Sequence, residues 1–260
     1  MADVSFNEVA SFPYKAPTKS ISYGPDPLQT AEYWGVEPTA PLILLIHGGC
    51  WLNAYDKDHI RPLATALAER GLAVLSVEYR RIGDTGGGWP GTFDDLDAVL
   101  EAALKLNHPA IIAAGHSAGG HLALWLGARP ASPLKGVVGL AAISDLVLYA
   151  KGTSRCEKAT LELMGGTPES YPDRYQAASP LLMTSELPTL LIHGSEDQIV
   201  NIQQSNQMFK QLSKPSSKPS PKGQPNVRLH VLEGHGHFDM VDPRQEVPDI
   251  IVEQVRVWLK

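Results

Sequence analysis

The sequence predicts an α/β fold with a mostly parallel sheet, on two observations. Six short apolar runs, each bounded by glycine, proline or charged residues, have the length of buried strands. Helix-like segments, with apolar residues three and four positions apart, separate most of these runs, and such alternation is typical of a parallel sheet with helices on both faces. The runs are nearly continuous in apolar residues, which indicates that both faces of the strands are covered. The expected strands are residues 42–46, 72–77, 110–114, 136–140, 189–193 and 227–232, and the expected helices are 60–70, 93–106, 119–128, 203–212 and 249–259.

Three segments fall outside this alternation. Residues 1–40, rich in proline, serine and tyrosine, are expected to form an N-terminal arm or an antiparallel hairpin at the sheet edge. Residues 149–180 interrupt the alternation after the fourth expected strand, so we expect a short helical insertion there, a candidate cap. Residues 213–225 are polar and proline-rich, which predicts a solvated loop. At 260 residues the chain is long enough for one large domain, and we expect a single domain over residues 1–260.

Composition and charge narrow the range of partners. The formal net charge of −6 provides no basic surface for a polyanion, which argues against nucleic acid and anionic membrane as partners. The N-terminus lacks the basic start and apolar run of a secretion signal, and no apolar run approaches the roughly 20 residues of a membrane span, so we expect a cytoplasmic protein. The two cysteines, Cys50 and Cys156, are too few for a disulfide framework or a four-cysteine zinc site, and free thiols are expected. The sequence is compatible with a homodimer.

The strongest chemical signal is a G-x-S-x-G motif, residues 115–119, between an expected strand and an expected helix. A serine on such a sharp turn needs small residues on both sides, because bulk at Gly115 or Gly119 would collide as the backbone doubles back. The turn would present the Ser117 hydroxyl at a helix N-terminus, where backbone N–H groups favour developing negative charge. Ser117 is therefore the predicted nucleophile.

A second motif, H-G-G-C-W at residues 47–51, follows the first core strand. Consecutive glycines let a chain turn its N–H groups toward a substrate oxygen without a Cβ in the way. We expect an oxyanion hole formed by the backbone amides of Gly48, Gly49 and Ala118. His47 is expected to stabilise its own loop.

A serine nucleophile needs a histidine base and an acid that orients it, and in this arrangement they follow in the order Ser, Asp, His. The acid is expected in the loop after the strand at 189–193, where Asp197 is the first choice, and Asp145 and Glu196 are the alternatives. The base is expected after the last strand, where His235 and His237 stand two residues apart and the residue pattern leaves both open. No carboxylate and histidine set at matching spacing supports a metal site, and no cofactor is expected.

Three further residues are candidates for the substrate pocket. Trp51 ends the glycine-rich motif, and Trp89 lies in the glycine-rich segment 83–91, which we expect to be a mobile loop near the active site. His121 follows Ser117 by one helical turn, so it is a candidate for the pocket floor, although a hydrogen-bonded packing role is favoured.

Over residues 40–260 these features resemble the α/β-hydrolase superfamily, which implies a mostly parallel central sheet with helices on both faces and a short cap-like insertion. The H-G-G-x-W motif at 47–51, the G-H-S-A-G-G-H-L-A tract at 115–123 and G-H-F-D at 236–239 are similar to those of kynurenine formamidases and related small carboxylesterases. In that group the last motif is commonly G-x-G-H-F, which implies His237 as the base.

The resemblance implies a serine hydrolase with the triad Ser117, Asp197 and His237 and the oxyanion donors Gly48, Gly49 and Ala118. Such an enzyme cleaves a small ester or an N-formyl amide through an acyl-enzyme intermediate. Two alternatives stay open: an aminopeptidase resembling the prolyl-oligopeptidase catalytic domain, suggested by the L-I-H-G run at 191–194 with Asp197 nearby, and a hydrolase fold kept as a ligand receptor.

Overall fold

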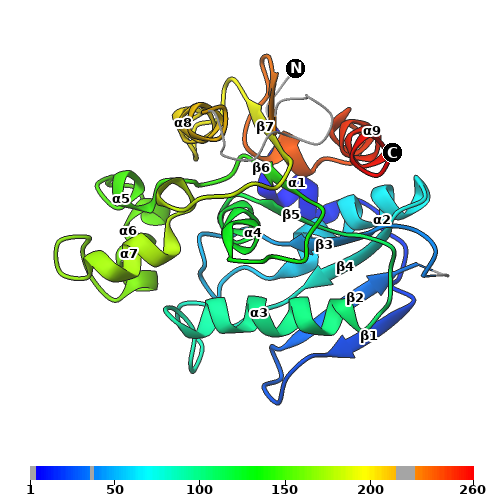
Figure 1. Cartoon of the computed structure of the whole chain (residues 1–260), viewed down its shortest axis with the longest axis horizontal. Helices are drawn as coiled ribbons and strands as arrows, with labels where there is room; N and C mark the ends of the chain where they lie inside the picture. Colours follow the sequence, from blue (N-terminus) through cyan, green and yellow to red (C-terminus); the bar gives the residue numbers. More distant parts are fainter. Residues whose placement is uncertain (1–3, 36–37, 215–225) are drawn as a thin grey trace.

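An eight-stranded sheet forms the centre of the molecule (Figure 1). The structure is a computed structural model that describes residues 4–35, 38–214 and 226–260. The strands lie in the order β1-β2-β4-β3-β5-β6-β7-β8, in which β2 is antiparallel to both of its neighbours and the pairs from β4 to β8 are parallel. The strands are β1 Lys19–Ser22, β2 Thr30–Trp34, β3 Leu42–Ile46, β4 Ala73–Val77, β5 Ile111–His116, β6 Gly136–Leu140, β7 Thr189–Gly194 and β8 Val227–Leu232.

Helices cover both faces of this sheet, because successive side chains of its strands point to opposite faces. In β3, Leu42 and Leu44 belong to an apolar cluster shared with α3 and α4, whereas Ile43 and Leu45 belong to one shared with α2 and α9. The helices are α1 Phe6–Ser11, α2 Arg61–Glu69, α3 Gly91–Leu104, α4 Ala118–Ala128, α5 Leu146–Tyr149, α6 Arg155–Met164, α7 Pro172–Ala178, α8 Gln203–Leu212 and α9 Val247–Trp258, with single 3-10 turns η1 Lys57–Ile60, η2 Pro180–Leu182 and η3 Phe238–Val241.

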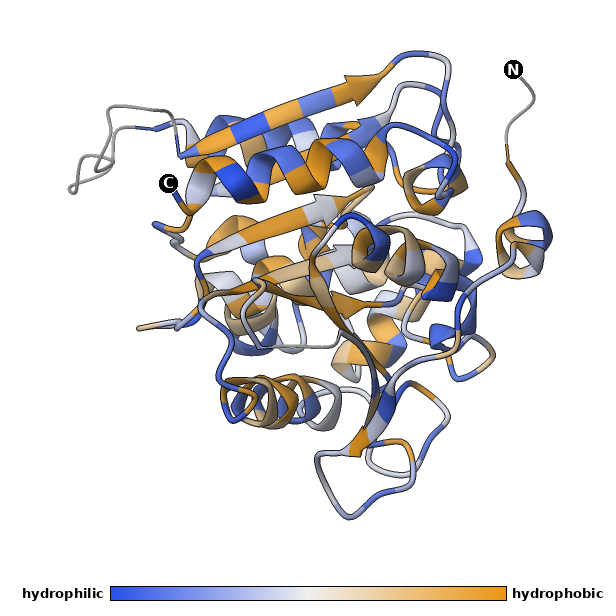
Figure 2. Ribbon diagram, turned by 90° about the vertical axis from the view of Figure 1, so that its right-hand side faces the viewer, coloured by the Kyte–Doolittle hydropathy of each residue, from blue (hydrophilic) through white to orange (hydrophobic). Residues whose placement is uncertain are grey.

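The predicted fold class is confirmed. The six predicted core strands coincide with β3 to β8, and the five predicted helices with α2, α3, α4, α8 and α9. All residues of β3 to β7 are buried, as their continuous apolarity predicts. The exception is β8, an edge strand in which Arg228 is exposed; Figure 2 shows hydrophobic and hydrophilic residues alternating along it.

The segments outside the alternation have their own structure. Residues 19–34 form an antiparallel hairpin at the sheet edge, and α1 precedes it. Between β6 and β7 the chain forms α5, α6 and α7, which together make the short helical insertion. Most of the loop predicted at 213–225 lies outside the described residues. None of the helices in the described ranges combines the length and apolar character that crossing a membrane requires.

Candidate active site

Ser117 lies on a strained turn between β5 and α4. Its φ of 56° falls in the left-handed region, which residues with a Cβ rarely adopt. The turn is held by a hydrogen bond of 2.8 Å from the amide of Ser117 to the carbonyl of Leu140 in β6. Ser117 is also the residue that precedes α4, so it lies where the first amides of a helix have no intrahelical acceptor. The predicted strand-turn-helix context of the motif is therefore present.

Two glycines allow this turn by close approach of the backbone. A Cβ at Gly115 would collide with the carbonyl of Gly119, and a Cβ at Gly119 would collide with the carbonyl of Ile46 at the end of β3. The helix that follows the serine is thereby packed directly against two strands. The spacing of the motif thus has the steric cause inferred from the sequence.

Asp197 and His237 are joined by a short hydrogen bond. Nδ1 of His237 lies 2.7 Å from Oδ2 of Asp197, and Oδ1 of Asp197 accepts from the backbone amides of Ile199 and Val200 at 2.8 Å each. Burial by itself would raise the pKa of the Asp197 carboxyl, but hydrogen bonds from His193 and His237 and from the amide of Val200 hold it well below its ordinary value. The carboxylate is therefore ionised at neutral pH.

This pairing determines the tautomer of the histidine. An ionised carboxylate can only accept, so Nδ1 of His237 carries the proton and Nε2 of the neutral ring keeps its lone pair. Ser117 and His237 line the same cavity but form no hydrogen bond with each other in this structure. Contacts of this kind often tighten only when substrate is bound.

The alternative acid and base residues are engaged elsewhere. Asp145 caps α5 by accepting from the amide of Leu148. His235 makes its ring contacts with the carbonyl of Glu233 and the side chain of Gln245. Glu196 is exposed and lies outside the cavity lining. The geometry therefore favours the pair of Asp197 and His237 over these alternatives.

The glycine-rich loop after β3 is oriented by His47. Nδ1 of this buried imidazole lies 2.7 Å from the carbonyl oxygen of Gly48, and its Nε2 lies 2.9 Å from the carboxylate of Glu78. Because the C=O and N–H of a trans peptide point in opposite directions, the N–H of Gly49 points away from His47 when the Gly48 carbonyl contacts that ring. Gly49 lines the cavity, so its amide is a candidate oxyanion donor. The amide of Ala118, the first residue of α4, is the other candidate donor.

The cavity is small and carries no formal charge on its walls. It has a volume of about 170 Å³. Burial, together with the neighbouring imidazole of His47, lowers the pKa of His59 to about 3, and burial with the neighbouring His237 places the pKa of His116 well below its ordinary value, so both rings are neutral. A larger hollow of about 780 Å³ beside Arg129 contains none of the predicted site residues. The residues that line the 170 Å³ cavity at Ser117 are Phe6, Gly49, Cys50, Tyr55, His59, His116, Ser117, Cys156, Ile199, His237 and Phe238.

The three pocket residues predicted from the sequence do not line this cavity. Trp51 and His121 are fully buried, and the indole N–H of Trp51 donates to Nδ1 of His121 while Nε2 of His121 contacts the carbonyl of Ala178. Burial lowers the pKa of His121 to about 4, so it is a neutral packing residue. Trp89 packs edge-on against Phe93 with 4.9 Å between ring centroids. For Trp51 and Trp89 the prediction was wrong, because proximity to a motif along the chain does not determine which side of the backbone a side chain takes. His121 has the hydrogen-bonded packing role that the sequence favoured for it.

Comparison with known proteins identifies the family. A family model with the description BD-FAE matches residues 35–212, which is most of the chain. The chain belongs to the BD-FAE family. Among curated proteins, the esterase LipC of Mycobacterium tuberculosis is 26% identical over 262 residues, which cover 88% of this chain and 62% of LipC. The uncharacterized peptidase YtmA of Bacillus subtilis is 30% identical over 148 residues, 53% of this chain and 57% of YtmA. This BD-FAE chain thus spans less than two thirds of either relative.

Solved structures show the α/β-hydrolase fold for this BD-FAE protein. A truncated carbohydrate esterase from gut microbiota has a TM-score of 0.76 at 19% identity and covers 94% of this chain and 99% of its own. A thermophilic esterase from Thermogutta terrifontis has a TM-score of 0.68 at 18% identity, over 93% of this chain and 90% of its own. At these identities the likeness concerns the fold.

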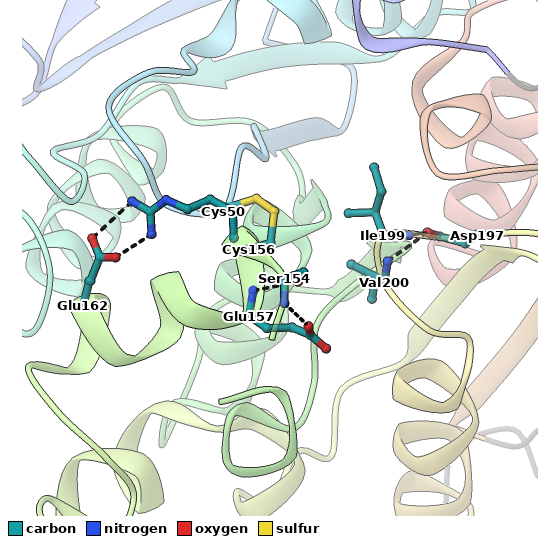
Figure 3. Close-up of a disulfide and its surroundings, with 9 residues drawn as sticks. Cys50, Ser154, Cys156, Glu157, Glu162, Asp197, Ile199 and Val200 are labelled. Carbon is teal, nitrogen blue, oxygen red and sulfur yellow. Dashed lines mark hydrogen bonds and ion pairs between the residues drawn. A yellow bond between two sulfur atoms is a disulfide. The ribbon is translucent and has the colours of Figure 1, made fainter. Parts of the chain in front are cut away.

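A disulfide joins Cys50 and Cys156 in this BD-FAE protein, so the prediction of free thiols was wrong (Figure 3). The two Cα atoms are 5.0 Å apart, within the usual range of bonded cysteines, although 106 positions separate the residues in sequence. The bond connects the glycine-rich loop to α6 of the insertion, and both cysteines line the cavity. Disulfides persist mainly in oxidising compartments, so this bond does not support the cytoplasmic location expected from the sequence.

Replacing both Cys50 and Cys156 by Ala is expected to lower stability by about 2–4 kcal/mol, because the cross-link restricts the unfolded chain. At roughly 2–4 °C per kcal/mol for a chain of this size, the melting temperature should fall by about 5–15 °C. Differential scanning calorimetry with and without a thiol reductant measures this. The reductant should lower the melting temperature of the unmodified protein to that of the double variant. It should leave the melting temperature of the double variant unchanged. An unmodified protein whose melting ignores the reductant would contradict this expectation.

Several site residues were not singled out from the sequence. His193, at the end of β7, contacts the carbonyl of Val200 through Nε2 and lies 3.3 Å from Oδ2 of Asp197, so it helps to hold the loop of the acid. Phe6, from α1, forms part of the cavity wall. Phe6 lies in no motif, and the L-I-H-G run that contains His193 gave no role for its side chain. Within the described ranges, no group of three or more His, Cys, Asp or Glu side chains is arranged to bind a metal ion.

Proposed function

We propose that this protein is a serine carboxylesterase that cleaves small esters through an acyl-enzyme intermediate. The hydrogen bond between Asp197 and His237, at a cavity that Ser117 also lines, carries this proposal. The strained turn at Ser117 and the orientation of the Gly48 carbonyl support it. The similarity to the esterase LipC and to LipM, a probable carboxylic ester hydrolase, both of Mycobacterium tuberculosis, supports it.

In the first half of the reaction, the Ser117 oxygen attacks the carbonyl carbon of the ester while Nε2 of His237 takes the hydroxyl proton. Asp197 stabilises the resulting imidazolium through the proton on Nδ1. The carbonyl oxygen becomes an oxyanion, which accepts hydrogen bonds from the amides of Gly49 and Ala118. Collapse of this intermediate breaks the bond to the alcohol oxygen, and His237 returns the proton to the departing alkoxide.

In the second half, water takes the place of the alcohol. His237 removes a proton from the water as it attacks the acyl carbon, and the second oxyanion uses the same two amides. When this intermediate collapses, the proton returns from His237 to Ser117 and the carboxylic acid leaves. Removal of one oxyanion donor typically costs about 100- to 1000-fold in rate. The Gly48 carbonyl and the Gly49 N–H belong to one peptide unit, so the contact of His47 with this carbonyl orients a proposed oxyanion donor.

Parallel turnover of three substrate types tests the proposal. We expect hydrolysis of p-nitrophenyl acetate with kcat/KM of about 10⁴ M⁻¹ s⁻¹ or more, the lower part of the usual range for enzymes. Cleavage of N-formylkynurenine alone would replace the proposed carboxylesterase function by the arylformamidase activity that the sequence motifs suggest. Cleavage of aminoacyl p-nitroanilides alone would favour a peptidase, the class in which the uncharacterized relative YtmA is named.

A fluorophosphonate probe separates a wrong choice of substrate from an inert serine. The activated hydroxyl of Ser117 is expected to displace fluoride and become phosphonylated, which intact mass and peptide mapping detect. Failure to label Ser117, together with no turnover of any of the three substrates, would reject the esterase and favour a ligand-binding role.

A further inference from the structure

The N-terminal helix α1 brings an aromatic ring to the wall of the cavity. Phe6 is the first residue of α1 and lines the same cavity as Ser117. In Figure 2 the helix next to the N-terminus lies on the right, the side toward which most of the strand arrows point. The carboxyl ends of parallel strands are where ligands bind in open α/β sheets. Phe6 therefore reaches the site from a helix that precedes the strands of the sheet in sequence.

Phe6 completes an aromatic wall made of four rings. Its centroid lies 5.4 Å from Tyr55, 5.3 Å from His59 and 5.7 Å from Phe238, within the range of favourable aromatic pairs. Tyr55 and His59 come from the segment that leads into α2, and Phe238 directly follows His237 in sequence. This aromatic wall (Phe6, Tyr55, His59 and Phe238) faces a cavity whose other lining includes Ile199 and the disulfide.

The helix that carries Phe6 is anchored by other residues. Ser5 and Glu8 form a capping box at its start, and Val9 is fully buried in the apolar cluster that includes α2 and α9. At its end Phe12 packs under the guanidinium of Arg244, which lies 4.1 Å from the ring centroid. Phe6 is half-buried and makes its ring contacts with the cavity wall. Removing its side chain should therefore open the cavity without releasing the helix.

The size and charge of the cavity define what can bind in it. Its volume of about 170 Å³ is smaller than the roughly 300–1,000 Å³ of a typical ligand pocket. The lining contains no Asp, Glu, Lys or Arg, and the rings of Phe6 and Phe238 give its wall an apolar surface. The group held there is therefore short and uncharged.

We propose that Phe6 is the specificity-determining residue that limits the acyl group of the substrate to short, neutral chains, from acetyl to about butanoyl. This rests on the esterase function proposed above. The alcohol part of the ester then projects past the exposed rim formed by Tyr55 and Ile199, which leaves its size free. Truncation of the ring adds room at the end of the acyl chain.

The test compares p-nitrophenyl esters from acetate to octanoate for the unmodified protein, Phe6→Ala, Phe6→Leu and Phe12→Ala. A single methylene in an apolar pocket discriminates by about 10- to 200-fold, so the unmodified protein should prefer acetate to octanoate by at least about 10-fold. Phe6→Ala should raise the octanoate to acetate ratio of kcat/KM by about 10-fold or more, and Phe6→Leu by less. Phe12→Ala, directly after the same helix and outside the cavity, should leave the ratio unchanged.

Each outcome decides between the two proposals. An unmodified protein that hydrolyses acetate, with the same ratio in all four proteins, would overturn the role of Phe6 and leave the esterase function standing. An equal shift in Phe12→Ala would also overturn it, because loosening of α1 would then be the cause. If Phe6→Ala does not fold, Phe6→Leu carries the test, since Leu keeps an apolar side chain at the wall. An unmodified protein inactive on every ester rejects the esterase function itself.

Discussion

Ser117→Ala is expected to lower kcat for p-nitrophenyl acetate by about 10⁴- to 10⁶-fold. Loss of the nucleophile removes the acyl-enzyme route, and residual turnover then comes only from the oxyanion donors and from binding. The side chain can be shortened without steric cost, since it lines a cavity. Steady-state kinetics and loss of fluorophosphonate labelling measure the effect.

A matched control separates chemistry from folding. Ser170 is exposed in the turn before α7, where its hydroxyl contacts Thr167, so Ser170→Ala should retain full activity. Both variants should melt within a few degrees of the unmodified protein. Ester hydrolysis by a folded Ser117→Ala protein at the original rate would disprove the nucleophile assignment.

Asp197→Asn is expected to lower kcat by about 10⁴-fold at neutral pH, the usual effect of imposing the wrong histidine tautomer. The asparagine oxygen can still accept from the amides of Ile199 and Val200. Its NH₂ group would then face Nδ1 of His237 as a donor, which moves the ring proton to Nε2. In that form His237 cannot take a proton from Ser117. Glu196→Gln, an exposed neighbour, is the matched control and should keep full activity.

The same variant has an expected effect on acid stability. The pKa of Asp197 is lower in the folded state than in the unfolded state. Its ionised form therefore stabilises the folded protein fully above about pH 4, the ordinary pKa of an aspartate. This stabilisation is lost as the pH falls through the folded-state pKa. The stability difference between the unmodified protein and Asp197→Asn should therefore be larger at pH 7 than at pH 3. Denaturant unfolding at both pH values measures it, and a difference that grows toward low pH would contradict the assigned charge state.

The local signals of the sequence predicted the frame of the molecule well. The segments of β3 and β7 are short and continuously apolar, as expected of strands in a parallel sheet that is covered by helices on both faces. Both strands are fully buried in the structure. The turn at Ser117 was equally readable, since its steric demand concerns only neighbouring positions such as Gly115 and Gly119. The spacing of apolar residues and of small residues can be read from neighbouring positions in the sequence. Predicting these strands and this turn therefore needed no information on tertiary contacts.

The choice between His235 and His237 required the folded chain. Resemblance favoured His237, but the residue pattern left both open, because histidines two positions apart carry the same chemistry. The structure places only the ring of His237 against Asp197, while His235 contacts Gln245. The direction of a side chain in an irregular loop depends on what packs against the loop, and the sequence around the two histidines does not contain that information.

The lining of the cavity was decided by contacts between segments far apart in the chain. Phe6 reaches the site only because α1 packs beside η1 and η3, and Cys156 only because α6 packs against the loop that holds Cys50. Trp51, next to the same loop, is instead buried against His121. By itself the sequence determined the parallel strands β3 to β8 and the turn at Ser117, because these follow from short-range periodicity and sterics. Only the tertiary structure decided which rings enclose the cavity and how the two cysteines pair, because packing brings together residues that have no relation along the chain.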